Sequence, residues 1–339
     1  MSPPSDQGVA DFPGIYYPAA TVSSLWVQGA ASLNREGQST LVVIGNFDGV
    51  HRGHQTLLSE ATRRSQERVL RPVVLTFVPH PAGALGRVAP PLLTTLERKV
   101  ELIRCYAPDI QVVVHPFDRS FASRTPEQFA FFLIDQLGAR EVVVGRNFRF
   151  GQGRSGDFTT LSELGQRLGF QVGAIALAGD EVGAWSSTRV REALAIGALE
   201  DANRVLGRPH ELEGIVIPGQ QRARHLGFPT ANLSNIPQAI PAHGVYAVQA
   251  LRLSDHGDPE LLGEGMANIG LRPTVAAGFA VEVHLFGFSA DLYGARLRIR
   301  LIARLREERV FAGLDELKAQ IAKDAEAARA ALCNATEKP

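Results

Sequence analysis

The sequence has no excess of charge of either sign, because its 339 residues include 35 Lys and Arg against 35 Asp and Glu. The two signs are also equal in number on either side of residue 200. A protein that binds nucleic acid through the phosphates usually has a basic excess or a basic stripe, since neutralised phosphates supply much of the affinity. The balance therefore argues against a nucleic-acid partner.

Cysteine and long apolar runs are also scarce. The two cysteines, Cys105 and Cys333, are too few for a disulfide framework and lack the spacing of metal ligands. No apolar run reaches about 18 residues, and residues 1–38 lack a charged segment followed by an apolar core, so neither a membrane span nor a secretory leader is expected. These absences predict a cytoplasmic protein with no membrane partner, and they leave the oligomeric state open.

Residues 39–200 alternate short apolar strands with helices. This pattern predicts a parallel sheet covered on both faces, which is a doubly wound, Rossmann-like α/β domain whose ligands bind beyond the carboxyl ends of the strands. Residues 1–38, rich in Pro, Gly, Ser and Ala, are expected to form a loose leader. Strands are expected at 39–45, 72–77, 110–114, 141–144 and 171–177, and helices at 53–67, 96–106, 126–137 and 161–168.

The pattern changes after residue 200. Residues 201–210 are expected to link the first domain to a second at 211–335. Strand-like segments bounded by turns indicate a small antiparallel barrel, closed by a helix at 314–331. The strand at 296–305 alternates strictly, with apolar residues on one face and mostly arginines on the other. A short helix is expected at 199–206, and further strands at 213–217, 244–250, 263–269 and 280–288.

The segment GNFDGVHRGH at residues 45–54 follows the first strand and opens the first helix. Its glycines let the backbone approach a ligand closely, and the free N–H groups of the helix N-terminus attract an anion. His51 and His54 can donate ring N–H groups to phosphoryl oxygens. We therefore interpret the segment as a phosphate site, the alternative being a glycine-rich turn with two solvent-facing histidines. Its other candidate phosphate-binding residues are Gly45, Asn46, Phe47, Asp48, Gly49 and Gly53.

A second phosphate-binding segment is expected where SSTRVR begins a helix near residue 186. Arginines in the first turns of a helix oppose its dipole, and a bound polyphosphate would remove that conflict. The alternative is a hydroxyl cap followed by exposed arginines. The candidate phosphate ligands of the segment are Ser186, Ser187 and Thr188.

In the second half of the chain, residues 219–232 form a loop that ends in a proline-fixed turn. Thr230 and Asn232 would share one side of an extended chain and present two neutral oxygens to a hard cation such as Mg²⁺ carrying ATP phosphates. Taken alone, the segment fits an ordinary loop equally well. On a later strand, Glu282 either meets solvent or serves as a base near a bound substrate. His284, on the same face, is expected to orient a neighbour or to pack in the core.

Together these motifs resemble the bacterial bifunctional riboflavin kinase/FMN adenylyltransferase (FAD synthetase) family. GNFDGVHRGH, VGRNFRFG and SSTRVR are similar to the nucleotidyltransferase module. GFPTAN, GMANIG, RPT, EVHL and DLYG are similar to the riboflavin kinase module, in the same order. The resemblance covers residues 41–324, and the lack of a KMSKS sequence disfavours an aminoacyl-tRNA synthetase.

The resemblance implies two ATP-dependent reactions and a requirement for Mg²⁺. In the kinase reaction, Glu282 takes the proton of the ribityl hydroxyl of riboflavin as that hydroxyl attacks the γ-phosphate of ATP, and FMN forms. Thr230 and Asn232 hold Mg²⁺ while the loop at 219–227 covers the phosphates. The residues expected at the phosphates are Gly219, Arg222, Arg224 and Gly227, and those expected at the flavin are Asn268 and Arg272.

In the adenylyltransferase reaction, the phosphate of FMN attacks the α-phosphate of ATP, pyrophosphate leaves and FAD forms. An anionic phosphate is already a nucleophile, so the main requirement is to stabilise charge on the triphosphate. The resemblance assigns that role to His51, His54 and Arg189. The residues expected on the flavin side are Asn147, Phe148 and Arg154.

Three positions depart from the family pattern. Asn147 stands where an Asp is usual, Ala223 replaces a glycine of the kinase loop, and Gly287 replaces an Asp. Gly287 is expected on the strand face opposite Glu282, with little effect on catalysis. Because Asn147 loses a carboxylate near the first site, one alternative to a bifunctional enzyme is a chain with an active kinase module alone. The other is a non-catalytic flavin or nucleotide sensor, against which the intact Glu282 argues.

Overall fold

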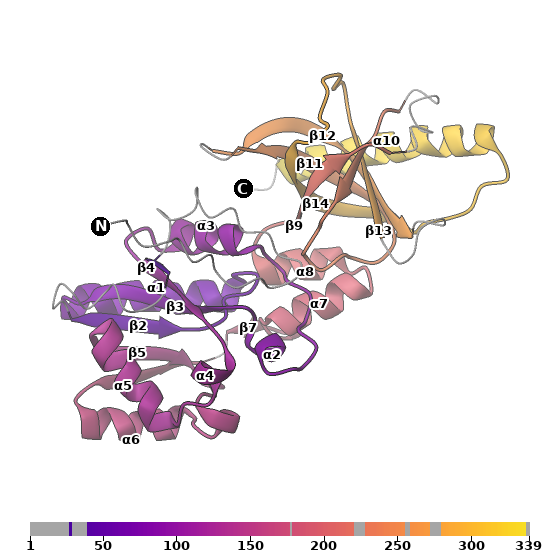
Figure 1. The fold of residues 1–339 in the computed structure, drawn as a ribbon. Coiled ribbons are helices and arrows are strands. Elements are labelled where there is room, and N and C mark those ends of the chain that lie inside the picture. The colour runs from indigo at the N-terminus through magenta and orange to yellow at the C-terminus, as the bar shows by residue number, and fades with distance from the viewer. Residues whose placement is uncertain are drawn as a thin grey trace, which may run out of the picture.

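The computed structural model describes residues 27–28, 39–176, 178–219, 228–254, 258–271 and 279–336. Within them the chain forms an α/β body built on a parallel sheet and a closed β-barrel, with a pair of helices between the two (Figure 1). Buried aliphatic and aromatic side chains form the cores of both bodies. This arrangement confirms the predicted fold class.

The sheet of the α/β body contains six parallel strands in the order β1-β4-β3-β2-β5-β6. Its central strand β2 (Thr40–Ile44) is buried at every position. Leu41 and Val43 face one core and Val42 and Ile44 the other, as expected for a strand covered on both faces. The other strands are β1 (Val27–Gln28), β3 (Arg71–Val78), β4 (Gln111–Pro116), β5 (Ala139–Gly145) and β6 (Gln171–Ile175).

Helices cover both faces of this sheet (Figure 1). On one face lie α1 (Arg52–Arg68) and α3 (Leu96–Tyr106), whose buried side chains pack with those of β2, β3 and β4. On the other lie α5 (Pro126–Leu137) and α6 (Phe158–Leu168). Three short helices lie in the loops, namely α2 (Pro81–Ala84), α4 (Arg119–Ala122) and the 3-10 helix η3 (Gln152–Arg154).

Local sequence signals set the ends of the longer helices. Thr95 begins α3, because its hydroxyl accepts a hydrogen bond from the Arg98 amide at 3.2 Å. Thr125 and Gln128 form a capping box at the start of α5. Gly138 ends α5 in the left-handed conformation, with φ of 65°. These signals explain why the predicted limits of both helices agree with the structure.

The chain order of the strands creates a switch point at the centre of the sheet. From β2 the chain passes to β3 and β4 on one side, whereas β5 and β6 lie on the other side of β2. The loops that leave the carboxyl ends of β2 and β5 therefore diverge, and sheets of this kind bind ligands in the crevice between such loops. The GNFDGVHRGH segment follows β2, and VGRNFRFG includes the end of β5, so two predicted motifs meet at this point.

The barrel consists of six antiparallel strands in the closed order β10-β13-β12-β11-β14-β9. On β13 (Phe279–Leu285), Val281 and Val283 lie in the core, so Glu282 between them points to the outer face. The helix α10 (Leu314–Thr336) packs on the outside of the barrel. The other strands are β9 (His210–Ile217), β10 (Ala231–Ser234), β11 (Gly244–Leu253), β12 (Glu260–Leu271) and β14 (Arg296–Arg306).

Two helices join the bodies. The helices α7 (Ser187–Ala195) and α8 (Leu199–Leu206) pack against each other, and their buried side chains belong to the same apolar cluster as the barrel interior. Asn203 adds polar contacts, because its amide donates to the Leu301 carbonyl at 3.0 Å and its side-chain oxygen accepts from the His210 amide at 2.7 Å. The cluster crosses the expected border between the domains, and the domain limits themselves stay a prediction.

A buried ion-pair network holds α3 against the barrel. Arg298 of β14 is 2% exposed and donates to Glu213 at 2.7 Å and to Glu101 of α3 at 3.0 Å. Arg98 of α3 donates to Glu211 of β9 at 2.6 Å. Removing one member of such a network would leave a buried charge without its partner, which is strongly destabilising. The network therefore fixes how the α/β body sits on the barrel.

Several short elements were not expected from the sequence. The strand β1 lies inside the stretch predicted as a loose leader and pairs with β4 at the edge of the sheet. The strand β10 and the hairpin of β7 (Gly179–Asp180) and β8 (Gly183–Ala184) lie in segments that lacked a strand pattern. Each of these strands spans four residues or fewer, which is too short for an alternating pattern to stand out.

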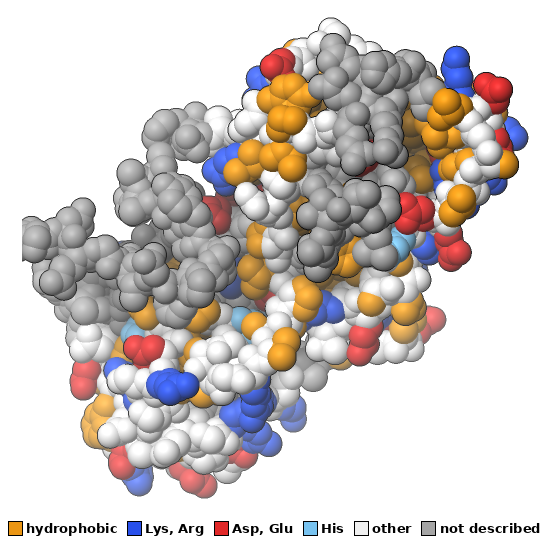
Figure 2. Space-filling model, turned by 45° about the vertical axis from the view of Figure 1, so that its right-hand side comes forward, with side chains coloured by type: hydrophobic (Ala, Val, Ile, Leu, Met, Phe, Trp, Pro, Cys, Tyr) orange, Lys and Arg blue, Asp and Glu red, His pale blue; other side chains and the backbone are white. Residues whose placement is uncertain are grey.

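Charged side chains are interspersed on the surface. On the face shown in Figure 2, Lys and Arg alternate with Asp and Glu, without a continuous basic stripe among the described residues. This mixture follows the balanced composition of the sequence. Within the part of the chain that the structure describes, no helix is both long and apolar enough to cross a bilayer.

Candidate active sites

The loop that follows β2 bends sharply before it enters α1. Phe47, Gly49 and Val50 have positive φ angles of 50°, 82° and 40°. A side chain at Gly49 would place its Cβ 2.8 Å from Leu93, whereas Phe47 and Val50 are fully buried, so the core holds this unfavourable backbone in place. Backbone strain of this kind clusters at functional sites. His51 follows this loop and occupies the N-cap position of α1.

His51 and His54 are stacked on each other at the start of α1. Their ring centroids are 3.7 Å apart and their planes differ by 24°. Gly53 makes room for the stack, because a Cβ there would lie 3.1 Å from the His51 ring and 2.9 Å from the Trp185 carbonyl oxygen. Phe47 supports His54, with the ring centroids 5.0 Å apart. The two predicted phosphate donors therefore lie together at the carboxyl edge of the sheet.

Burial keeps both rings neutral. It lowers the pKa of His51 to about 4, and the nearby charges of Arg208 and Arg191 act in the same direction. Burial also lowers the pKa of His54 well below its usual value, with further contributions from His51 and Lys99. The Nδ1 atoms of both rings are buried and have no hydrogen-bond partner. Unpaired buried polar atoms are unfavourable, so the two histidines retain unsatisfied hydrogen-bonding capacity.

Asp48 fastens this loop to its neighbours. Its Oδ1 accepts hydrogen bonds from the amides of Leu93 at 2.9 Å and Thr94 at 3.3 Å, and its Oδ2 pairs with Arg191. Its carbonyl oxygen accepts from the Ser187 hydroxyl at 2.8 Å. The carboxylate thus joins the GNFDGVHRGH loop to α7, and a direct contact with the nucleotide stays a prediction.

The remaining candidates in these two segments occupy the same edge of the sheet. Gly45 and Asn46 are half-buried at the end of β2, where the Thr76 hydroxyl donates to the Asn46 carbonyl at 3.1 Å. Ser186 caps α7, because its hydroxyl accepts a hydrogen bond from a backbone amide of the first turn at 3.2 Å. Thr188 is exposed. The hydroxyl cap of the alternative interpretation is therefore present, whereas the exposed arginines of that alternative are not, because the Arg189 and Arg191 side chains are only 12% and 17% exposed.

The structure separates the two arginines of the SSTRVR segment. The Arg189 guanidinium is 12% exposed and contacts Asp180 at 2.6 Å and Asp201 at 2.6 Å, so it is held by two carboxylates. Arg191 instead pairs with the loop and lies close enough to lower the pKa of His51. Arg191, rather than Arg189, therefore contributes charge beside His51, and the role predicted for Arg189 at the triphosphate stays a prediction.

The candidates for the flavin side lie across the switch point, at the end of β5. A Cβ at Gly145 would come within 3.2 Å of the Asn147 side-chain oxygen, so that side chain folds back over the strand end. Phe148 stacks on Phe150, with centroids 5.5 Å apart and planes 11° apart. Arg154 is exposed and has a φ of 62°. Their contact with a flavin stays a prediction.

Three polar side chains form a row across the outer face of the barrel. Glu282 of β13 pairs in register with Asn232 of β10 on one side and with Asn268 of β12 on the other. Directly paired residues of antiparallel strands point to the same face, with Cβ atoms about 4.5–5.5 Å apart. Asn232 is buried and the other two are half-buried. The predicted base, one predicted metal ligand and one predicted flavin contact thus lie side by side.

A glycine and a histidine position the end of this row at which Mg²⁺ binding is predicted. A Cβ at Gly219 would overlap the side-chain amide of Asn232, so glycine leaves the space that this amide occupies. The Nδ1 of His284 donates to the Pro229 carbonyl at 2.8 Å. This bond ties β13 to the segment that carries Thr230. His284 therefore orients a neighbour, which is one of the two roles expected from the sequence.

Several expected residues lie outside the described part of the chain. These residues are Arg222, Ala223, Arg224, Gly227 and Arg272. Gly287 lies in the turn after β13, with φ of 67°, so the prediction that it lies on a strand face is wrong. Its positive φ suits a glycine, and the strand ends before this position.

Three cations near the stacked histidines were not singled out from the sequence. Arg191 lies four residues after Ser187 and therefore on the same helix face. This spacing within SSTRVR is the sequence signal that could have identified Arg191 as a residue of the site. Lys99 comes from α3, and Arg208 comes from the link between α8 and β9. Their charges contribute to the lowered pKa values of the two histidines. Nothing in the sequence around Lys99 or Arg208 resembles a phosphate-binding motif.

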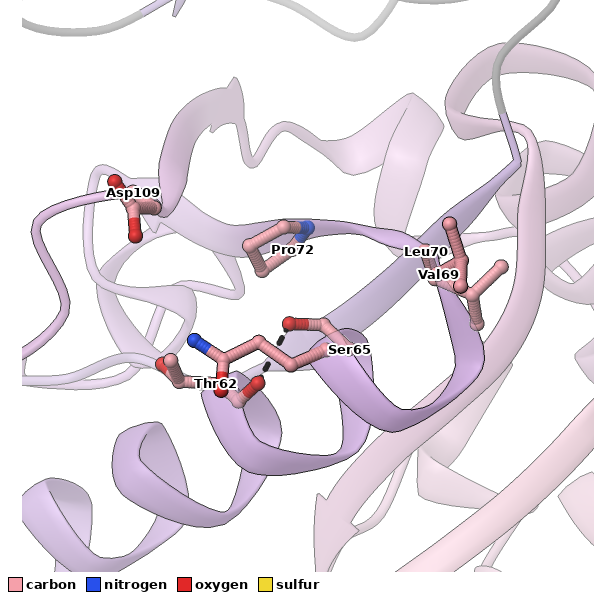
Figure 3. A pocket seen from close by; sticks show the side chains of 7 residues that line it. Thr62, Ser65, Val69, Leu70, Pro72 and Asp109 are labelled. Carbon is pink, nitrogen blue, oxygen red and sulfur yellow. Dashed lines mark hydrogen bonds between the residues drawn. The ribbon is translucent and has the colours of Figure 1, made fainter.

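An open surface hollow of about 390 Å³ lies away from both sites. Figure 3 shows Thr62 and Ser65 of α1 on one side of it, and Pro72 and Asp109 on another. Pro72 is near the start of β3, so the hollow lies at the amino edge of the sheet, opposite the loop that carries the histidines. The Ser65 hydroxyl is bonded to the Thr62 carbonyl at 2.8 Å. The hollow therefore belongs to neither candidate site.

Two family models match the chain, one for each body. A FAD synthetase model matches residues 33–189, and a riboflavin kinase model matches residues 206–332. The first range contains the stacked histidines, and the second contains the row of Asn232, Glu282 and Asn268. The order of the two models along the chain is the order of the α/β body and the barrel.

Curated relatives match nearly the whole chain and carry one name. The bifunctional riboflavin kinase/FMN adenylyltransferase of Escherichia coli (strain K12) is 40% identical over 307 residues, which cover 89% of this chain and 96% of that protein. The protein of this name from Haemophilus influenzae is 37% identical over 310 residues, or 90% and 98% of the two chains. That from Bacillus subtilis is 37% identical over 303 residues, or 86% and 92%.

One solved structure shares the fold over almost its whole length. It is a crystal structure described as a macrolide-efflux protein from Streptococcus pneumoniae, with a TM-score of 0.78 and 27% identity. The match covers 90% of this chain and 99% of that chain. That protein is named for efflux, whereas the relatives of higher identity are named for the kinase and adenylyltransferase reactions.

Proposed function

The chain belongs to the bifunctional riboflavin kinase/FMN adenylyltransferase family, and we propose that its two candidate sites divide the two reactions between them. The barrel phosphorylates riboflavin to FMN, and the α/β body adenylylates FMN to FAD with release of pyrophosphate. The separation of the chemical groups supports this division. The barrel presents a carboxylate in a polar row, and the sheet presents two neutral histidines at its switch point.

The kinase reaction needs one base, and Glu282 fits that role. Among the described residues, none forms a hydrogen bond or an ion pair with its carboxylate. The carboxylate is therefore free to accept the proton of the ribityl hydroxyl as that oxygen attacks the γ-phosphate of ATP. The bond from the γ-phosphorus to the β,γ-bridging oxygen breaks, and ADP leaves. Asn268, on the next strand, contacts the flavin substrate.

The oxygens beside Glu282 fit Mg²⁺. The Asn232 amide and the Thr230 hydroxyl are neutral oxygen donors, which suit a hard cation that also carries phosphate ligands. Gly219 supports this assignment, because its missing side chain leaves the space for the Asn232 amide. The ion would neutralise charge on the β- and γ-phosphates. The residues that would cover these phosphates are Gly219, Arg222, Arg224 and Gly227, and Arg272 would lie at the flavin.

The adenylyltransferase reaction needs donors rather than a base. The FMN phosphate is already anionic and attacks the α-phosphorus, while the bond to the pyrophosphate oxygen breaks. His51 and His54 stay neutral near pH 7 and donate N–H groups to the triphosphate as charge moves onto the leaving group. Arg191 supplies positive charge, and Arg189 holds α7 in place through Asp180 and Asp201. The other residues that would contact ATP are Gly45, Asn46, Phe47, Asp48, Gly49, Gly53, Ser186, Ser187 and Thr188.

The flavin phosphate approaches from the β5 side of the switch point. Asn147, Phe148 and Arg154 lie on that side and would contact FMN. Asn147, which stands where the family usually has an Asp, is compatible with contact to the FMN phosphate. An amide can donate to a phosphate oxygen, whereas a carboxylate at the same place would repel the anion. We therefore expect the adenylyltransferase reaction to be retained.

The reactions are expected to take place in the cytoplasm. Both cysteines, Cys105 and Cys333, are exposed and unpaired. Exposed thiols of this kind persist in a reducing compartment. The cytoplasm would also supply the ATP that both sites consume.

A product-resolved assay tests the proposed function. The purified chain is incubated with riboflavin, ATP and Mg²⁺, and the flavins are separated over time. FMN is expected first, followed by FAD and pyrophosphate. FMN without FAD would mean that the kinase module alone is active, and the absence of both products would favour a flavin or nucleotide sensor.

A further inference from the structure

Two cations near the stacked histidines, the buried Lys99 and the half-buried Arg208, belong to neither phosphate-binding motif. Lys99 on α3 is 8% exposed. Arg208 lies between α8 and β9, and its Nε is buried without a hydrogen-bond partner. Cations are almost never fully buried unless an anion balances them. The groups that surround each cation therefore show whether a ligand is missing.

The charge of Lys99 is poorly balanced. Asp48 favours its charged form, while desolvation lowers the pKa of its ammonium group. The Asp48 carboxylate is already engaged by Arg191 and by the amides of Leu93 and Thr94. Among the described residues, none forms a hydrogen bond or an ion pair with the Lys99 ammonium. Two cations thus share one carboxylate at this place.

The charge of Arg208 is balanced no better. Glu211 favours its charged form, yet Glu211 already accepts hydrogen bonds from Arg98 at 2.6 and 2.9 Å. Burial lowers the pKa of Arg208 to about 10. Gln55 of α1 fixes the link beside the histidine loop, because its amide donates to the carbonyl of Leu206 at 2.9 Å. The Arg208 side chain is therefore held near α1 with one buried donor unpaired.

Both cations act on the place where the histidines also lack partners. The charge of Arg208 lowers the pKa of His51, and that of Lys99 lowers the pKa of His54. The Nδ1 atoms of both rings are buried and unpaired. Gln55 ties the Arg208 link to the histidine loop, because its amide donates to the carbonyls of both Leu206 and Val50 at 2.9 Å. Positive charge and unpaired polar nitrogens therefore occur together around the stacked histidines. A ligand with several negative charges would satisfy both at once.

We propose that Lys99 and Arg208 bind the phosphates of ATP, and of the departing pyrophosphate, at the adenylyltransferase site. The inference rests on the proposed function of that site and adds two residues from outside its motifs. Because Arg208 lies in the link to the barrel, the α/β body does not build this phosphate site alone.

Kinetic measurements on the full chain test the proposal. The variants are Lys99→Met and Arg208→Gln, and the matched controls are Lys318→Met and Arg204→Gln, whose side chains are exposed. Each test variant should lower kcat/KM for ATP in FAD formation from FMN by about tenfold or more, since each removes a charged contact to phosphate. FMN formation from riboflavin should not change, and the controls should match the wild type in both reactions.

Thermal unfolding with and without pyrophosphate separates ligand binding from a structural role. Pyrophosphate should raise the Tm of the wild type by mass action, and Lys99→Met should lose most of that rise. Its ligand-free Tm should not fall, because the variant removes a buried charge that lacks its own counter-charge. A lower ligand-free Tm with loss of both activities would make Lys99 a structural partner of Asp48. An unchanged pyrophosphate shift with unchanged FAD formation would equally overturn the proposal.

The proposed function can fail separately from this inference. If the wild type makes no FAD but shows a pyrophosphate shift that depends on Lys99 and Arg208, the anion site stands and the assigned reaction is wrong. If the wild type makes FAD and neither variant affects it, the reaction stands and the two cations serve another purpose.

Discussion

The two candidate sites differ in burial and in charge. At the switch point of the sheet, two neutral histidines lie among Lys99, Arg191 and Arg208, and these cations share few carboxylates. On the barrel, Glu282 stands in a row of amides and has no hydrogen bond or ion pair with another described residue. The first site is therefore suited to a polyanion, and the second offers a carboxylate that can accept a proton, as we propose.

This difference matches what each nucleophile needs. A hydroxyl must lose its proton as it attacks, so the kinase site requires a group that accepts protons. A phosphate is already anionic, so the adenylyltransferase site requires donors and positive charge, and an added base would contribute little. The two proposed sites thus have opposite charge arrangements, each suited to one of the two phosphorus-transfer reactions.

Loss of Glu282 should separate the two reactions most strongly. In Glu282→Ala, FMN formation from riboflavin should fall by about 10² or more, because the hydroxyl loses its base. FAD formation from supplied FMN should not change. Both rates are measured on the same preparation, with the exposed Glu260→Ala as the control variant. Equal loss of both reactions would mean that Glu282 is structural or that the sites are coupled.

Loss of His54 should produce the opposite selectivity. In His54→Ala, FAD formation from FMN and ATP should fall by about 10², since one donor to the triphosphate is removed. FMN formation from riboflavin reports whether the chain remains folded and should be unaffected. FAD synthesis at the wild-type rate would remove His54 from the site.

Loss of the His284 hydrogen bond should weaken the kinase reaction without abolishing it. In His284→Ala, the Pro229 carbonyl loses its donor, and the segment with Thr230 is no longer tied to β13. We expect the kinase rate at a fixed Mg²⁺ concentration to fall about tenfold. The main cause should be a rise in the Mg²⁺ concentration that gives half of the maximal rate. His284→Asn keeps an N–H donor and should restore most of the rate. Equal losses in the Ala and Asn variants would argue against the positioning role.

The burial of His51 should also appear as a modest pH dependence of stability. Because burial lowers its pKa from 6.5 to about 4, the unfolded chain binds a proton that the folded chain does not as the pH falls through this range. Stability is therefore lost on acidification, and His51 should contribute about 1 kcal/mol of that loss between about pH 7 and 5.5. Urea unfolding of the wild type and of His51→Gln at about pH 7 and 5.5 measures the contribution of His51 to this loss of stability. An identical pH dependence in the two proteins would contradict the burial argument.

Much of the fold could be predicted because its signals are local. The helix limits at Thr95 and Thr125 come from capping residues, and the apolar strands of the sheet stand out against the helices between them. The pairing of His51 with His54 also follows from local spacing at a helix start. Such features depend on neighbours in the sequence, so a single sequence contains them.

Features that depend on distant contacts could not be predicted in the same way. Asn232, Glu282 and Asn268 were each singled out, yet their common row exists only because closure of the barrel sets the register of three strands. The two carboxylates that hold Arg189 come from a short hairpin and from α8. Their convergence is a property of the packed structure.

Complementation between two variants that each lack one reaction tests most directly whether the two sites perform separate reactions. Glu282→Ala and His54→Ala are each incubated with riboflavin, ATP and Mg²⁺, alone and as a mixture, and FAD is measured. Neither variant alone should make much FAD, because one cannot form FMN and the other cannot use it. The mixture should restore FAD synthesis, since FMN from the second variant is adenylylated by the first. A mixture that makes no more FAD than its components would contradict two sites that each perform one reaction.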